Sequence, residues 1–262
     1  MPELPEVETR LLYFERTVLG QCIDRVIITA PNMIKSSGAR KFAHDLKGRC
    51  FVSAHRRGKY LIVTLDNGRL LLLHFGMGGD LYYYDKAADR PDYTRIEFIL
   101  QNTRRLAFTC PRKICRVMLV DDVNQVPALR EMGPEPLGLE FSFGFLERLI
   151  EERGRRQIKP LLMDQGMIAG IGNIYADEIL FESRVRPDRL ASSLDGDEIR
   201  RIHRATKRIL RRAMRTAAEE EFPENFLVSR DARGAVCGVC GTRIERKTIG
   251  GRTAHFCPQC QV

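Results

Sequence analysis

Two pairs of cysteines constrain the C-terminal end of this chain more tightly than any other sequence feature. Each pair has the spacing C-x-x-C, and 16 residues separate Cys237 and Cys240 from Cys257 and Cys260. Four thiolates at this spacing can surround one zinc ion tetrahedrally, with a β-hairpin between the two cysteine turns. We therefore predict a zinc finger over residues 226–262 that holds one structural Zn²⁺ and takes no part in the chemistry.

The other four cysteines are scattered through apolar, strand-like segments: Cys22, Cys50, Cys110 and Cys115. The acidic first ten residues do not resemble a signal peptide, and no apolar run reaches about 18 residues. We therefore expect a cytoplasmic protein in a reducing compartment. In that setting these four cysteines are expected to be buried small hydrophobic residues.

The first half of the chain is rich in strand patterns. A helix is expected from Pro5 to Gly20, and Asp66-Asn67-Gly68 is a strong hairpin signal. A short helix is expected at 38–46, and the strands at 22–30, 50–55, 60–65, 70–75, 81–84, 96–100, 106–109 and 116–120. So many short strands in about 120 residues are typical of an antiparallel β-sandwich or barrel. We place this N-terminal catalytic domain at 1–130.

A segment rich in proline and glycine near residues 130–138 separates this part from a helical one. Helices are expected at 143–152, 158–163 and 173–183, and Asp195 with Glu198 forms a capping box for a fourth. We place the helical domain at 131–225. The fold class is therefore α+β, with a β-sandwich preceded by a helix, a helical domain and a zinc finger.

The balance of charges favours a polyanionic partner. Lys and Arg number 43 against 34 Asp and Glu, and the net charge is +9. Nucleic acid is the commonest partner of such a protein, although scattered solvated charges give the same balance. For most of the basic residues on the last long helix, we favour a solvated face.

A glycine-rich segment at 165–175 joins two of the expected helices. Its three glycines permit close approach of a ligand, and it ends at a helix N-terminus, where free N–H groups favour an anion. Gly172 and Asn173 are thus candidate phosphate ligands. Because glycine-rich helix connections are often only steric, this pattern alone leaves both interpretations open.

The N-terminus carries a candidate nucleophile. Removal of Met1 exposes the secondary amine of Pro2, which can attack a sugar C1′ and form an iminium ion that makes β-elimination possible. Glu3 and Glu6 can move protons at the sugar. The alternative is an ordinary helix start with favourable acidic residues.

Taken together, three groups of residues resemble the formamidopyrimidine-DNA glycosylase family, which includes endonuclease VIII. They are the N-terminal segment 1–9, the segment 172–175 and the four-cysteine finger. Segments 56–60, 133–137 and 158–164 also look like family segments, so the resemblance runs nearly end to end.

The resemblance implies a β-sandwich, a helix–two-turn–helix domain and a zinc finger. It implies a bifunctional DNA glycosylase and AP lyase of base excision repair that flips oxidised bases out of the duplex. Pro2 would be the nucleophile and Glu3 the acid/base residue, with β-elimination following and δ-elimination left open. The partner would be double-stranded DNA with oxidised bases or abasic sites, and the protein a bacterial monomer that joins the nucleoid when bound to DNA.

The same resemblance assigns residues that would hold the flipped nucleotide. Lys59, counted with the catalytic residues, would grip phosphates together with Asn173 and Arg252. Met77 and Arg112 would fill the hole left by the extruded base. The remaining candidates for the DNA interface lie in the matching segments: His74, Ile114, Lys159 and Gly172.

Three features depart from the family pattern. Ile114 stands where an aromatic wedge is usual, and Cys110 and Cys115 replace an acidic residue and a glycine. The stretch 216–236 looks short for the loop that covers a flipped 8-oxoguanine, so we expect this lesion to be handled less well than formamidopyrimidines or oxidised pyrimidines. Two other functions are considered, a catalytically silent damaged-DNA binder and an unrelated zinc-ribbon module, although neither accounts for Pro2 and Glu3.

Overall fold

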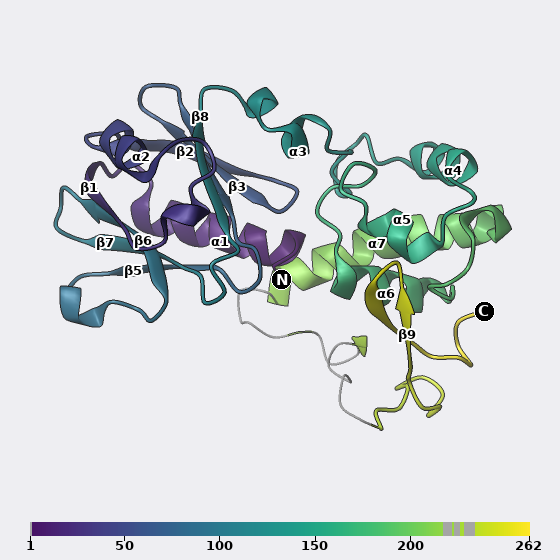
Figure 1. Ribbon diagram of the computed structural model, residues 1–262. Coiled ribbons are helices and arrows are strands. Elements are labelled where there is room, and N and C mark those ends of the chain that lie inside the picture. The colour runs from purple at the N-terminus through teal and green to yellow at the C-terminus, as the bar shows by residue number, and fades with distance from the viewer. Residues whose placement is uncertain (1, 217–221, 223–225, 228–233) are drawn as a thin grey trace. The chain divides into compact units, whose positions relative to one another are not determined.

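The computed structural model describes residues 2–216, 222, 226–227 and 234–262 (Figure 1). The chain divides into two compact units, one made of residues 1–2 and 6–130, the other of residues 3–5 and 131–262. Residues 3–5 thus belong to the second unit although the chain around them belongs to the first. The two units are described separately below.

Residues 6–130 form two antiparallel four-stranded sheets. The first has the order β1 (Ile23–Ile28), β6 (Thr94–Leu100), β7 (Arg105–Thr109), β5 (Asp80–Tyr84). The second has the order β2 (Phe51–Arg57), β3 (Tyr60–Leu65), β4 (Leu70–His74), β8 (Arg116–Val120). Buried residues of both sheets belong to one apolar core, so the predicted antiparallel β-sandwich is confirmed.

Helix α1 (Leu4–Val18) contributes to the same core. Val7, Leu11, Phe14 and Val18 recur at helical spacing and are all buried. Gly20, with φ of +81°, follows the helix and lets the chain turn towards β1. Shorter elements complete the unit: α2 (Ala39–Leu46), α3 (Pro127–Arg130), and the 3₁₀ turns η1 (Pro31–Met33), η2 (Ala87–Asp89) and η3 (Val123–Gln125).

The described part of the second unit contains four α-helices and a 3₁₀ turn. They are α4 (Phe143–Glu152), α5 (Ile158–Met163), α6 (Asn173–Ser183), η4 (Ala191–Ser193) and α7 (Gly196–Thr216). The predicted capping box starts α7: Asp195 Oδ1 accepts from Glu198 N at 2.7 Å, and Glu198 Oε2 accepts from Asp195 N at 3.0 Å. The predicted helical domain is confirmed.

The zinc finger contains the predicted hairpin, formed by β9 (Glu245–Ile249) and β10 (Arg252–Phe256) (Figure 1). Gly250 and Gly251 make its turn with positive φ values. The last residues of the chain bind back to the loop after α6, because Gln261 Nε2 donates to Val185 O at 2.8 Å. The finger is thus part of the second unit.

Of the four cysteines expected to be buried small hydrophobic residues, Cys110 and Cys115 are buried, whereas Cys22 and Cys50 are half-buried. The expectation that they are unpaired is wrong. Cys22 and Cys50 face each other at an isolated antiparallel bridge and are joined as a disulfide. Cys110 and Cys115, both buried, are joined across the loop between β7 and β8. Spacing along the sequence did not indicate either pair, because tertiary contacts bring the first pair together and a tight loop the second.

Among the described residues, no helix combines the length and apolarity needed to cross a membrane.

Candidate active site and zinc centre

The side chain of Glu3 occupies the N-terminus of α6. Its carboxylate accepts hydrogen bonds from Gly172 N at 2.7 Å, Ile174 N at 2.9 Å and Tyr175 N at 3.3 Å. It is 2% exposed. Amide N–H groups at a helix N-terminus stabilise a negative charge, so the chain holds an anionic group directly next to Pro2.

Two glycines of the glycine-rich segment leave space for the N-terminal segment. A Cβ on Gly172 would lie 2.3 Å from Glu3 Cδ, and one on Gly170 would lie 2.8 Å from Leu4 Cβ. Leu4 N also donates to Gly170 O at 3.1 Å. The close approach predicted for these glycines is therefore an approach of the protein's own residues, and any contact of Gly172 with DNA stays a prediction.

Asn173 keeps its candidacy as a phosphate ligand. It is the first residue of α6, and its Oδ1 is buried without a hydrogen-bond partner among the described residues. An amide oxygen only accepts hydrogen bonds, so this atom cannot bind a phosphate oxygen. A phosphate contact of Asn173 would come from its Nδ2 donor and stays a prediction.

In the first unit, the turn between β2 and β3 carries Lys59. Arg56 fixes this turn, because its Nε donates to Glu8 of α1 at 2.7 Å and its Nη1 to Gly58 O at 3.1 Å. Lys59 is only 7% exposed. Glu6, also on α1, is half-buried, and its carbonyl accepts from Arg10.

His74 lies opposite Tyr60 in the same sheet, with the ring centroids 4.8 Å apart. Burial, reinforced by Arg116 and Lys59, lowers the pKa of His74 to about 4. The imidazole is therefore neutral at physiological pH, and its Nδ1 accepts from Gly76 N at 3.3 Å. This places His74 as a support for the turn that bears Met77.

The residues expected to fill the vacated base position gather in the first unit. Arg112 Nη1 lies 3.5 Å from Met77 Sδ, and Met77 and Ile114 are 42% and 47% exposed. A Cβ on Gly76 would lie 2.9 Å from Ile114 O, so the two loops pack closely together. Two exposed apolar side chains beside a guanidinium can enter a base stack and face a polar base edge.

Lys159 does not present its amino group to solvent. It is 0% exposed, and its Nζ lies 2.8 Å from Asp177 Oδ1 and donates to Thr253 O at 2.9 Å. Burial lowers the pKa of Lys159, and the Asp177 carboxylate opposes that shift. The geometry offers no direct phosphate contact, whereas Arg252 at the start of β10 is exposed.

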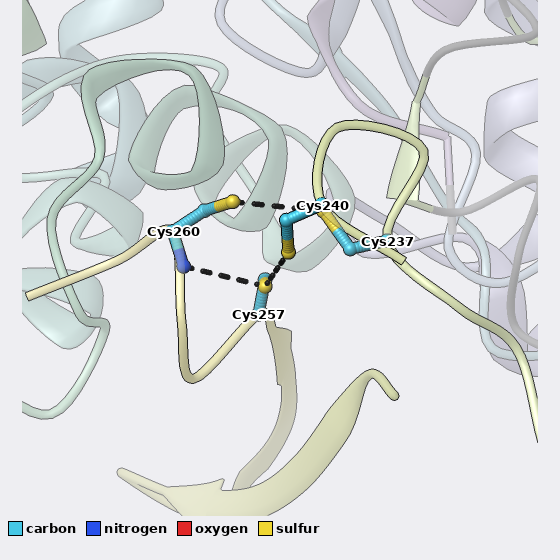
Figure 2. Close-up of side chains that lie close together, drawn as sticks. All are labelled: Cys237, Cys240, Cys257 and Cys260. Carbon is cyan, nitrogen blue, oxygen red and sulfur yellow. Dashed lines mark hydrogen bonds between the residues drawn. The ribbon is translucent and has the colours of Figure 1, made fainter. Parts of the chain in front are cut away.

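The four cysteines of the finger converge (Figure 2). Their sulfur atoms all lie within 4.8 Å of one another, with Cys237 Sγ 3.8 Å from Cys260 Sγ and Cys240 Sγ 3.5 Å from Cys257 Sγ. Tetrahedral coordination with Zn–S bonds of about 2.3 Å sets the sulfur atoms about 3.8 Å apart. The residues therefore fit one structural zinc ion, as predicted.

Sequence reasoning missed three residues that fix the site. Glu8 and Arg56 hold the Lys59 turn, and Asp177 pairs with Lys159. Glu8 and Arg56 lie within segments that looked like family segments, which is a weak signal. Nothing in the local pattern linked Asp177 to a lysine 18 residues earlier.

Comparison with known proteins covers almost the whole chain. Residues 1–117 match the family model of the formamidopyrimidine-DNA glycosylase N-terminal domain, 132–221 that of its H2TH domain, and 234–262 that of a zinc finger found in FPG and IleRS. Formamidopyrimidine-DNA glycosylase of Pelotomaculum thermopropionicum is 36% identical, over 100% of this chain and 99% of the relative. That of Listeria monocytogenes is also 36% identical, over 100% of both.

Among solved structures, the Lactococcus lactis enzyme in complex with a FAPY-dG containing DNA superposes with a TM-score of 0.90. It is 29% identical and covers 99% of each chain. Identity above 30% with two curated relatives over their full length extends the likeness from fold to family. The chain belongs to the formamidopyrimidine-DNA glycosylase family.

Proposed function

We propose that this protein is a bifunctional DNA glycosylase and AP lyase of base excision repair, acting on oxidised bases in double-stranded DNA. The observation that carries the proposal is the binding of the Glu3 carboxylate by three backbone N–H groups, an arrangement that we call the seat of Glu3. Glu3 directly follows Pro2 in the sequence. A glutamate that only started a helix would not need hydrogen bonds from a segment about 170 residues away in the sequence.

The reaction begins at Pro2 once Met1 has been removed. The amine lone pair attacks C1′ of the flipped nucleotide, and the base leaves with the electrons of the glycosidic bond and a proton. Opening of the sugar ring, with a proton delivered to O4′, gives an iminium ion. Loss of the C2′ proton then expels the 3′-phosphate and breaks the strand. Glu3 stabilises the cationic intermediate and relays protons.

The other candidate residues hold the nucleotide. Lys59, Asn173 and Arg252 grip its phosphates, while Met77, Arg112 and Ile114 occupy the position that the base has left. The cost of unstacking is a few kcal/mol, and these contacts offset part of it. The relative from Lactococcus lactis, seen on FAPY-dG containing DNA, supports a formamidopyrimidine as one substrate.

The domain limits follow from the same proposal: a catalytic β-sandwich at 1–130, a helix–two-turn–helix domain at 131–225 and a zinc finger at 226–262. One flipped base requires only one copy of the chain, so a monomer is the active form. Binding to chromosomal DNA would place the protein at the nucleoid.

Borohydride trapping on a duplex with an abasic site tests the proposal, because borohydride reduces an iminium to a stable covalent adduct. We expect an adduct that maps to residue 2, its loss in Pro2→Gly, and a strongly reduced yield in Glu3→Gln. An intact-mass measurement establishes beforehand that Met1 is absent. Binding to the damaged duplex without any adduct would instead identify a catalytically silent damage-binding protein.

A further inference from the structure

The hairpin that carries Arg252 is held on both sides of that residue. On one side, a Cβ on Gly250 would lie 2.8 Å from Pro160 Cγ, so the turn is packed tightly on α5. On the other side, Thr253 O accepts from Lys159 Nζ at 2.9 Å. Lys159 and Pro160 are neighbours, so α5 fixes the chain immediately before and after Arg252.

Asp177 fixes the same strand from α6. Its Oδ2 accepts from His255 N at 3.1 Å, and its Oδ1 lies 2.8 Å from Lys159 Nζ. Lys159 is 0% and Asp177 4% exposed. Burying an ion pair of this kind costs much desolvation free energy, so the pair adds little to the stability of the fold. Such a pair can instead hold the segments that it joins in one arrangement.

Helix α6 therefore carries several parts of the site in sequence. Its N-terminal N–H groups seat Glu3, its first residue is Asn173, and Asp177 follows one turn later and holds β10. Any shift of β10 relative to α6 moves Arg252 relative to Glu3 and Asn173. Phosphate contacts depend on such fixed spacing, because they determine the register of the protein on DNA.

We propose that Lys159 and Asp177 are positioning residues: their buried pair clamps the β9–β10 hairpin onto α5 and α6 so that Arg252 reaches a phosphate of the flipped nucleotide. This inference rests on the proposed function, and specifically on Arg252 as a phosphate ligand. It gives Lys159 an indirect role in DNA binding through the peptide group of Thr253.

The test uses Lys159→Met/Asp177→Asn, which removes both buried charges together and leaves neither unpaired. It is compared with Arg252→Gln, with the combination of all three changes, and with Lys41→Met. Lys41 has an exposed side chain that lies 3.0 Å from Asp45, and it controls for the loss of one lysine. Thermal unfolding and zinc content show whether each variant is folded.

Two readouts separate the inference from the proposed function. The first is affinity for a duplex with a non-cleavable abasic analogue, measured over a range of KCl concentrations. The second is the rate of borohydride trapping at saturating protein. This rate measures how fast Pro2, assisted by Glu3, forms the iminium ion. Loss of one phosphate contact lowers the slope of log affinity against log salt by about one.

We expect Arg252→Gln to lose about one unit of slope and on the order of tenfold in affinity. Lys159→Met/Asp177→Asn should show the same losses of slope and affinity while keeping its zinc. Adding Arg252→Gln should then cause no further loss, because both changes remove one contact. Lys41→Met should bind as the wild type does.

A folded, zinc-containing Lys159→Met/Asp177→Asn variant with the wild-type slope would overturn the inference, as would losses that add to those of Arg252→Gln. A wild-type slope in Arg252→Gln would overturn it together with the phosphate role of Arg252. If the double variant loses its zinc, Lys159→Met alone, which removes the donor to Thr253 O and keeps the Asp177 acceptor of the His255 amide, should still lower the slope. Absence of trapping in the wild type would refute the proposed function and leave the salt slopes to decide the clamp.

Discussion

At the scale of single residues, the site depends on close packing around two glycines. Gly172 lies against Glu3, and Gly170 against Leu4, with no space for a side chain at either place. Glycine is therefore required here by close packing of protein against protein. A substitution as small as Gly172→Ala can therefore displace Glu3, the proposed acid/base residue, without changing Glu3 itself.

Gly172→Ala should abolish this seat. The added Cβ would lie 2.3 Å from Glu3 Cδ, so the carboxylate must leave the N–H groups of α6. We expect the rate of borohydride trapping to fall on the order of 100-fold, which is typical of removing an acid/base group. Gly196→Ala is the matched control, because no atom lies within 4 Å of its added Cβ. A folded Gly172→Ala protein that traps at the wild-type rate would refute the role of the seat.

His74 should make stability depend on pH. Above pH 6.5 both the native and the unfolded chain carry a neutral imidazole. Below pH 6.5, His74 binds a proton in the unfolded chain. In the native chain it does so only near pH 4, because burial lowers its pKa. Stability from this group is thus complete above pH 6.5 and is lost as pH falls towards 4, by up to roughly 3 kcal/mol.

Chemical denaturation of the wild type and His74→Asn at pH 7.5 and 4.5 measures this contribution. The wild type should lose more unfolding free energy on acidification than the variant does. The same comparison with His44→Asn, at an exposed histidine of α2, controls for the loss of one imidazole. Equal losses in the wild type and His74→Asn would show that His74 titrates alike in both states.

At the scale of elements, helix ends carry much of the organisation. The N-terminus of α6 is capped by Glu3 from a distant part of the chain, and that of α7 by the local capping box. The first cap uses long-range contacts and, in the proposed function, holds a residue that takes part in the reaction. The second uses neighbouring residues and stabilises the helix. Only the local cap could be read from sequence, since a capping box is a pattern of spacing.

The cap of α7 provides a direct test of that distinction. Asp195→Ala removes the acceptor of the Glu198 N–H group, and loss of such a cap costs about 1 kcal/mol. We expect the melting temperature to fall by about 2–4 °C, with trapping activity unchanged. Asp197→Ala removes the same charge from the same helix turn without removing a cap, and should have a smaller effect. An equal effect of both changes would assign the loss to charge alone.

At the scale of the whole molecule, the sequence predicted what periodicity and spacing encode. The helices α4, α5 and α6 have the predicted bounds, as do β3 and β8, because apolar repeats and turn residues mark them. The zinc centre followed from its spacing. The disulfide between Cys22 and Cys50, the Glu3 seat and the Lys159–Asp177 pair each join segments distant in sequence, and no local pattern records such partners.

We expect the choice of lesion to depend on the connection between α7 and the finger. In the family that this chain resembles, that region carries a loop over a flipped 8-oxoguanine. Residues 217–221, 223–225 and 228–233 lie outside the described structure, but two residues between them are fixed. Phe226 is 1% exposed, with its ring 6.5 Å from that of Tyr175, and Leu227 N donates to Glu178 Oε2 at 2.9 Å. Only nine residues connect Thr216 to Phe226.

By length alone, nine residues between Thr216 and Phe226 are few for a segment that would cover a flipped 8-oxoguanine. We therefore expect excision of a formamidopyrimidine or an oxidised pyrimidine to be faster than that of 8-oxoguanine opposite cytosine. Single-turnover rates on duplexes of one sequence measure this, with each lesion compared against an abasic site in the same position. The abasic duplex needs no base recognition and should be cleaved fastest. If 8-oxoguanine opposite cytosine is excised faster than the other bases, the covering contacts come from elsewhere and the short connection does not set the choice of lesion.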